Sequence, residues 1–316
     1  MNFGFSEEQD TIRETLARML GDHATLAGAH DLLDRQDGFD TTTWSVLADG
    51  GWLGLAMSEA DGGSGMGAIE LAILAEEIGR CLASVPFIPV LCLAVPAIQS
   101  AGTENQRKSL LPDIAAGRTI IAAALAEGEG LAPDTVSATV VQDRLSGQKT
   151  PVSFGTEATH ALVAAKDESG TARLYIADLS ASGVTTCSLD PIDGTRPTAE
   201  ITFDNTPVEL LPGSDPATIQ RLLDGAAVLA AFEQIGIAER ALQAVKHRLA
   251  DMFAKIELAR SNAFFGVWAL ASGDSRLPEA AAVARLTALD AVQFTTEESI
   301  QLHGGIGMTW EYSLAH

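Results

Sequence analysis

Helical periodicity covers the first third of the chain, where apolar side chains recur every three or four residues. Ser6 and the acidic residues after it supply an N-cap and a charged first turn, which predicts that a helix begins there. Further helices are predicted at residues 41–49, at residues 68–80 with Gly79 as the cap, and as two segments within residues 85–117, the second starting at Thr103. These helices form a predicted first domain, residues 1–118.

In the middle of the chain the period changes to that of strands. Short β-branched runs within residues 120–211 are separated by Gly, Asp, Pro and Ser at intervals of about ten residues. Such runs are typical of a compact antiparallel β domain, folded as a barrel or a sandwich. The predicted middle domain covers residues 119–213.

Helical periodicity returns at Pro216 and predicts a C-terminal helical bundle over residues 214–316. Residues 217–271 contain few breaks, and at about 1.5 Å per residue one unbroken helix would be a rod of roughly 80 Å. A rod of that length is unusual in a compact domain. Apolar spacings of four and three form a core-facing stripe on it: Val245, Leu249, Met252, Ile256, Ala259, Ala263 and Val267.

Composition places the chain among globular proteins, since 47% of its 316 residues are hydrophobic. Its 20 basic and 42 acidic residues give a net charge of −22 (20 − 42), which argues against binding to nucleic acid or to an anionic membrane. The three cysteines lack metal-ligand spacing, so neither a zinc site nor a disulfide framework is predicted. The acidic N-terminus and the lack of an apolar run of ~20 residues predict a soluble, cytoplasmic protein.

The main candidate for ligand chemistry is the segment IQLHGGIGMTW at residues 300–310. Gly304, Gly305 and Gly307 have no Cβ atom, so the backbone there can approach a flat or charged ligand closely. Gln301 and His303 place an amide and an imidazole beside them, which suits a phosphate or an adenine. A glycine-rich helix C-cap explains the same glycines without a ligand.

With the residues that follow it, this segment resembles the Q-x-x-GG-x-G-x-T/S-x-E-Y motif of the acyl-CoA dehydrogenase family. DGGSGMGAIELAILAEEIGR resembles the family's GG-x-G segment and its EE-x-G-R helix end, and GTENQRKSLLPDIAAG resembles GTEEQK-x-x-x-LP-x-L-x-x-G. The resemblance implies an α+β fold with an N-terminal helical domain, a middle antiparallel β domain and a C-terminal helical bundle.

The resemblance also implies a cofactor, FAD. In the family the glycine-rich turn contacts the adenosine diphosphate half of an FAD that is held mainly by a neighbouring subunit. Two residues have an alternative interpretation without a cofactor: Gln243 as a solvent-exposed surface residue and His303 as a packing residue. The cofactor-binding residues that the resemblance implies are Gln243, Gln301, Gly304, Gly305 and Gly307.

Two segments resemble the family's flavin cradle but have lost several of its side chains. L-T-E-P-x-x-G-S-D, which holds the isoalloxazine ring, resembles residues 125–133, where Glu127 is kept and Ala126 and Ala132 replace the threonine and the serine. Alanine cannot donate a hydrogen bond. The cradle is therefore predicted to be depleted.

The second segment, G-x-K-x-W-I-T/S-N-G, resembles residues 147–155. Lys149 and Ser153 match this motif, whereas Pro151 replaces the aromatic residue that packs on the flavin. A plain β-turn is the favoured interpretation of these residues.

The family reaction needs a carboxylate that removes the α proton of an acyl-CoA while the flavin accepts a hydride. One known location of this glutamate aligns with Ala226, and Asp224 is a neighbour with a shorter reach on another face of the helix. The second location lies beyond His316. No catalytic base is assigned.

In the family an R-x-x-F-G turn separates segments that resemble GIAERAL and QAVKHRLADM. In this chain Leu242 is followed directly by Gln243. Either the chain has lost the turn, or the sequence lacks a loop of roughly twenty residues at this point. We favour the second interpretation.

A depleted cradle beside a retained adenosine turn resembles the α2β2 acyl-CoA dehydrogenases that act on steroid or bile-acid side chains. It implies an FAD site at a subunit interface, an acyl-CoA substrate that is dehydrogenated between its α and β carbons, a homologous partner subunit, and an electron-transferring flavoprotein as acceptor. The alternatives are a self-sufficient homotetramer, a non-catalytic scaffold of the same fold, and a flavin oxidase or monooxygenase.

Overall fold

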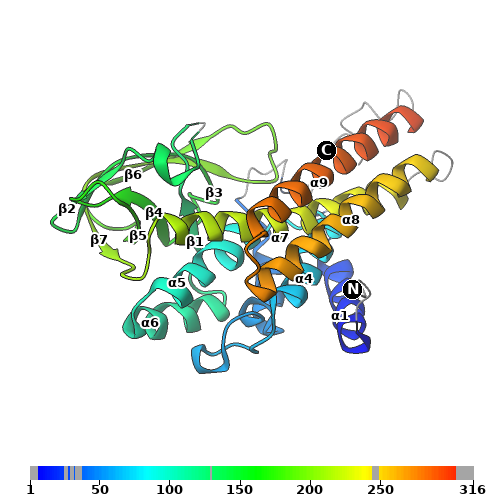
Figure 1. Ribbon diagram of the computed structural model, residues 1–316, viewed down its shortest axis with the longest axis horizontal. Helices are drawn as coiled ribbons and strands as arrows, with labels where there is room; N and C mark the ends of the chain where they lie inside the picture. Colours follow the sequence, from blue (N-terminus) through cyan, green and yellow to red (C-terminus); the bar gives the residue numbers. More distant parts are fainter. Residues whose placement is uncertain are drawn as a thin grey trace. The chain divides into compact units, whose positions relative to one another are not determined.

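The computed structural model describes residues 6–24, 28, 32, 38–128, 130–243 and 249–303 (Figure 1). Contacts divide the chain into two compact units. The helical unit comprises Met1–Asp34, Met66–Ala83 and Asp224–His316, and the mixed unit comprises Arg35–Gly65 and Ser84–Leu223. The domain limits at residues 118 and 213 stay predictions.

Five long helices supply most of the helical unit. The predicted start of the first is confirmed, because Ser6 Oγ accepts a hydrogen bond from Gln9 N and the Gln9 side chain accepts one from Ser6 N. Helix α1 (Glu7–His23) packs on α4 (Ala68–Cys81), and α8 (Leu249–Ser272) and α9 (Leu277–His303) lie side by side (Figure 1). The helices are α1 (Glu7–His23), α4 (Ala68–Cys81), α7 (Pro216–Gln243, in this unit from Asp224), α8 (Leu249–Ser272) and α9 (Leu277–His303).

The prediction that Gly79 caps α4 is wrong. The last residue of the helix is Cys81, and its C-cap is Leu82, which has a left-handed conformation with φ of 53°. Gly79 lies on the buried face of α4, where a Cβ atom would overlap the backbone carbonyl oxygen of Glu233 in α7. Gly236 meets the carbonyl oxygen of Glu76 in the same way, so α4 and α7 are in backbone contact at these two glycines.

Residues 217–271 do not form a single rod. α7 ends at Gln243 and α8 begins at Leu249. Glu239 of α7 and Arg260 of α8 form an ion pair across 21 residues, which would span about 32 Å along one straight helix. The two helices therefore fold back on each other, and the residues between Gln243 and Leu249 lie outside the described part of the chain.

The mixed unit contains the remaining described helices. The predicted helix at residues 41–49 is confirmed as α3 (Thr41–Asp49), and Thr103 caps the predicted last helix through a reciprocal pair of hydrogen bonds with Gln106. The other helices of the mixed unit are η1 (Trp52–Gly54), η2 (Glu59–Asp61), the π-helix η3 (Ile88–Ala94), α5 (Val95–Ala101), α6 (Glu104–Ala115) and η4 (Pro133–Thr135).

No helix in either unit, among the described residues, is both long and apolar enough to cross a bilayer.

Seven strands form one sheet, whose pairings close into a ring in the order β4–β5–β7–β3–β2–β4. Of the two predicted shapes, a barrel and a sandwich, the ring corresponds to the barrel. Alternating residues such as Leu145, Val163 and Phe203 point into its core. The strands are β1 (Ile121–Ala124), β2 (Thr139–Val141), β3 (Arg144–Ser153), β4 (His160–Lys166), β5 (Ala172–Asp178), β6 (Val184–Leu189) and β7 (Thr198–Leu210).

The sheet departs from the prediction in two details. β4 pairs in parallel with β1 and with β2, whereas all other pairs are antiparallel; the long connections between these strands allow the parallel pairs. Residues 147–155, interpreted as a plain turn, lie mostly in β3. Register shifts between β3 and β7 on either side of residues 147–149 accommodate Gly147 and Pro151 within the strand.

Candidate cofactor site

The two segments that resemble a flavin cradle come together in the mixed unit. Gly128 N donates a hydrogen bond to Thr150 O (2.8 Å), and Thr150 N donates one to Ala126 O (3.1 Å). The chain just after β1 is thus held against the end of β3. The structure therefore brings together residues that lie about twenty positions apart in the sequence, as the resemblance implies.

A buried ion pair fixes this junction. Lys149 Nζ lies 2.5 Å from Glu127 Oε1, and the lysine side chain is 0% exposed. The Glu127 carboxylate also accepts hydrogen bonds from Ser137 Oγ, Ser137 N and Ala138 N. Four donors on one carboxylate hold three segments of backbone in a defined arrangement.

The environment of this pair determines its ionisation. Partial burial raises the pKa of Glu127, but the hydrogen bonds from Lys149 and Ser137 outweigh burial and bring that pKa to about 2. Burial lowers the pKa of Lys149, and the Glu127 carboxylate opposes that shift. The Glu127 carboxylate is therefore charged at neutral pH.

The side chains that would face a flavin are a poorer match. Ala126 and Ala132 offer no hydrogen bond, and Pro151 has no aromatic ring to pack on the isoalloxazine. Ser153 keeps a hydroxyl and is exposed, and Leu131 exposes 48% of its surface beside the junction. The described cradle keeps its framework but does not fit a complete isoalloxazine site.

The catalytic position on α7 has no carboxylate. Ala226, which aligns with the family base, is buried. Asp224 is half-buried and is already engaged in an interaction within the chain. No base is therefore assigned among the described residues.

The residues predicted to serve the adenosine half of FAD are only partly described. Gln301 is exposed in the last turn of α9, and Gln243 ends α7. The side chain of Gln243 and the residues Gly304, Gly305 and Gly307 lie outside the described part of the chain. Their cofactor role stays a prediction.

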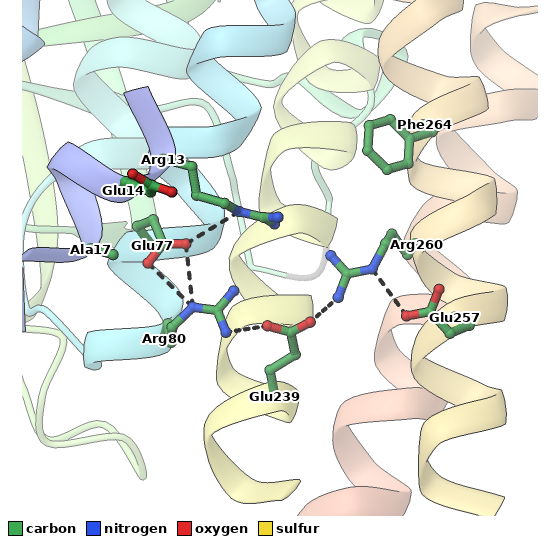
Figure 2. A pocket seen from close by; sticks show the side chains of 9 residues that line it. All are labelled: Arg13, Glu14, Ala17, Glu77, Arg80, Glu239, Glu257, Arg260 and Phe264. Atoms are coloured by element: carbon green, nitrogen blue, oxygen red, sulfur yellow. Dashed lines mark hydrogen bonds and ion pairs between the residues drawn. The ribbon is translucent and has the colours of Figure 1, made fainter. Parts of the chain in front are cut away.

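The helical unit contains a charged cavity of about 550 Å³ that was not predicted from the sequence (Figure 2). Among its lining residues, Glu239 lies between Arg80 and Arg260 and forms ion pairs with both. The cavity is lined by α1, α4, α7 and α8, through the residues Arg13, Glu14, Ala17, Glu77, Arg80, Glu239, Glu257, Arg260 and Phe264.

The buried Glu76 forms ion pairs with all three of the arginines that line the cavity. Its Oε1 lies 2.5 Å from Arg13, 3.0 Å from Arg80 and 2.9 Å from Arg260, and its side chain is 0% exposed. Its Oε2 is buried without a hydrogen-bond partner among the described residues. Burial also raises the pKa of the adjacent Glu77, with Arg80 opposing and Glu76 reinforcing the shift.

The sequence carries a signal for this network that was interpreted only as the family's EE-x-G-R helix end. Glu76 and Glu77 interrupt the apolar run LAILAEEIG on a helix whose residues 71–79 are all buried. Two adjacent glutamates on such a helix require cationic partners, because an unpaired buried carboxylate is costly. Arg80 comes from α4 itself, whereas Arg13 and Arg260 come from two other helices, α1 and α8, which the sequence alone does not reveal.

Comparison with known proteins identifies the class. Residues 6–118 match the family described as "Acyl-CoA dehydrogenase, N-terminal domain", and residues 217–316 match "Acyl-CoA dehydrogenase, C-terminal domain". Helical N- and C-terminal parts around a β-rich middle region are the fold that the resemblance implied, so the predicted α+β class is confirmed. Fold and matches place the chain in a family of flavoprotein oxidoreductases.

The relatives narrow this class. The chain is 30% identical over 329 residues to acyl-CoA dehydrogenase IpdE2 of Mycobacterium tuberculosis, with 98% of this chain and 89% of that protein covered. It is 32% identical to a solved variant of the Tcur3481–Tcur3483 steroid ACAD, with a TM-score of 0.85 and coverage of 98% and 90%. The ChsE4–ChsE5 complex of Mycobacterium tuberculosis shares the fold, with a TM-score of 0.90, 22% identity and coverage of 100% and 91%. This chain belongs to the acyl-CoA dehydrogenase family.

Proposed function

We propose that this chain is one subunit of a hetero-oligomeric, FAD-dependent acyl-CoA dehydrogenase, and that it completes a flavin site cradled by a homologous partner. The observation that carries the proposal is the state of its own cradle. The Glu127–Lys149 framework is intact, whereas Ala126, Ala132 and Pro151 replace the side chains that would contact the flavin. Ala226 at the base position is consistent with chemistry that depends on another subunit.

In this proposal the chain binds the adenosine diphosphate half of FAD through Gln243, Gln301 and the glycines Gly304, Gly305 and Gly307. Bound FAD supplies hydride acceptance for the α,β-dehydrogenation of a CoA thioester. The chain's own contribution is binding and orientation: glycines allow close approach to the phosphates, and glutamine amides donate hydrogen bonds.

The relatives suggest the substrate and the partners. The neighbour at 32% identity is described as a steroid ACAD formed by two named components, and ChsE4–ChsE5 is likewise a complex. By analogy we propose a steroid side-chain thioester as the substrate, a homologous dehydrogenase chain as the partner, and an electron-transferring flavoprotein as the electron acceptor.

Exposed apolar side chains on α9 support the proposal that this chain binds a partner subunit. Val283, Leu286 and Leu289 recur every three residues and are exposed, Leu286 to 66%. Three exposed aliphatic side chains on one helix form a surface of the kind that protein interfaces bury. An assembled complex would cover them.

The proposal is tested with Gln301→Ala in the complex formed by co-expression with a homologous acyl-CoA dehydrogenase. We expect FAD affinity to fall about tenfold, because one amide contact is worth roughly 1–1.5 kcal/mol. Gln293→Ala is the matched control, since Gln293 is also an exposed glutamine on α9 and hydrogen-bonds to Glu297.

The outcome separates the alternatives. Equal FAD affinity in both variants would contradict the adenosine role. Turnover by the chain alone would favour a self-sufficient homotetramer, and a complex that never contains flavin would favour a non-catalytic scaffold. Rapid reaction of the reduced flavin with oxygen would indicate an oxidase or monooxygenase.

A further inference from the structure

We infer that Glu239 is a positioning residue for the cofactor-facing end of α7 and acts by bridging Arg80 and Arg260. The inference deepens the proposed function and rests on it, because it concerns the end of α7 at which Gln243 lies. Glu239 precedes Gln243 by four residues, which is about 6 Å along the helix. A change in the position of Glu239 is therefore transmitted directly to Gln243.

The two carboxylate oxygens of Glu239 bind two different helices (Figure 2). Oε2 forms an ion pair with Arg80 of α4, and Oε1 forms one with Arg260 of α8. The side chain is 20% exposed, so water screens these contacts only partly. A single side chain thus fixes the end of α7 against the helices on both sides of it.

The close packing of the α7 backbone on α4 also restricts the position of this end of α7. Gly236, three residues before Glu239, allows α7 to touch the backbone of α4 at Glu76. The glycine contact sets the distance between the helices, but it offers no side chain that resists rotation of α7 about its own axis. Glu239 supplies that resistance, since its two ion pairs point to opposite neighbours.

Both arginines are themselves held in place. Arg80 also contacts Glu76 and Glu77, and Arg260 also contacts Glu76 and Glu257. Each guanidinium in the wall of the cavity is therefore committed to protein carboxylates. This commitment favours a positioning role for the cluster over the binding of a separate anionic ligand.

The test uses the flavin-containing complex with Glu239→Gln in this chain. We expect the FAD dissociation constant to rise about tenfold while turnover per bound flavin stays unchanged. Glu257→Gln is the matched control, because the ion pair of Glu257 with Arg260 lies within α8 and the Glu257 side chain is 46% exposed. We expect the FAD affinity of this variant to stay within twofold of wild type.

A second control separates positioning from general destabilisation. Glu70→Gln weakens the hydrogen bond that Gly67 N donates to Glu70 Oε2 at the start of α4 and the contact with Gln9 in the same unit, but it leaves the end of α7 intact. If Glu70→Gln lowers the melting temperature as much as Glu239→Gln and weakens FAD binding equally, the inference is overturned. It is also overturned if Glu239→Gln binds FAD like wild type.

Failure of the proposed function gives a different result. If the wild-type complex contains no flavin, or if the chain alone binds flavin, the split-site proposal is contradicted whatever the variants do. If the wild-type complex binds flavin and only Glu239→Gln proves neutral, the split site stands and the positioning role is rejected.

Discussion

The two units solve the problem of buried charge in different ways. In the mixed unit Glu127 is paired with one lysine, accepts four donors, and has a pKa lowered to about 2. In the helical unit Glu76 and Glu77 lie side by side among arginines, Glu76 Oε2 has no partner among the described residues, and burial raises the pKa of Glu77. Several hydrogen-bond donors stabilise the charged form of a carboxylate, whereas burial, reinforced by a neighbouring carboxylate, destabilises it.

The same comparison shows which parts of the fold depend on charge. The Glu127–Lys149 pair joins backbone segments beside Ala126, Ala132 and Pro151, the residues that replace three side chains of the flavin-cradle motif. It therefore has a structural role that persists without the flavin. The arginine–glutamate network joins four helices, and its member Glu239 lies next to a residue that we assign to the cofactor.

The largest effect is expected from Glu127→Gln, which leaves the fully buried Lys149 without a counter-charge. We expect a loss of about 3 kcal/mol or more in the free energy of unfolding, measured by urea titration. The double variant Glu127→Gln with Lys149→Met should recover most of the loss, because no buried charge is left unpaired. A loss in the double variant equal to that in the single variant would contradict this account of the pair.

A smaller loss is expected from Gly236→Ala in the helical unit. The added Cβ would overlap the backbone of α4 at Glu76, and forcing α7 outward should cost about 2 kcal/mol. Gly170→Ala is a useful control, because nothing lies within 4 Å of a Cβ there, although its φ of 80° adds its own strain. Unchanged stability of Gly236→Ala would contradict backbone contact between α4 and α7.

The effect that separates the two clusters by sign is the pH dependence of stability. The pKa of Glu127 is lower in the folded chain than in the unfolded one, so its contribution is present above about pH 4.3 and is lost as the pH falls towards 2. The stability difference between wild type and Glu127→Gln should therefore shrink in acid.

Glu77 should behave oppositely. Its pKa is raised by folding, so its contribution is present below about pH 4.3 and is lost as the pH rises through the raised value. Glu77→Gln should gain stability relative to wild type as the pH increases over that range. Urea unfolding of both variants at matched pH values checks the signs, and parallel curves for the two variants would contradict the contrast.

Sequence reasoning succeeded where structure is set locally. The caps at Ser6 and Thr103 and the bounds of α3 follow from residues within one helical turn of each other. It failed for Gly79, whose role is decided by α7 about 150 residues away, and for β3, where Gly147 and Pro151 argue locally against a strand that two neighbours nevertheless stabilise.

In the candidate site, too, some features were indicated by the sequence and others were not. The resemblance assigned residues 125–133 and residues 147–155 separately to a flavin cradle, and the structure joins them through Glu127 and Lys149. The arginine–glutamate network was missed, because a helical period shows which face of α4 is buried but not which cations meet it. Gln243, Gln301 and the glycine turn stay predictions that solution measurements must test.

The most direct test of the central claim is the visible flavin absorbance per chain of this protein, purified alone and after co-expression with a homologous acyl-CoA dehydrogenase. A split site predicts flavin in the complex and none in the chain alone. Flavin at one equivalent in the chain alone would contradict the claim, because the altered cradle would then be sufficient to hold FAD.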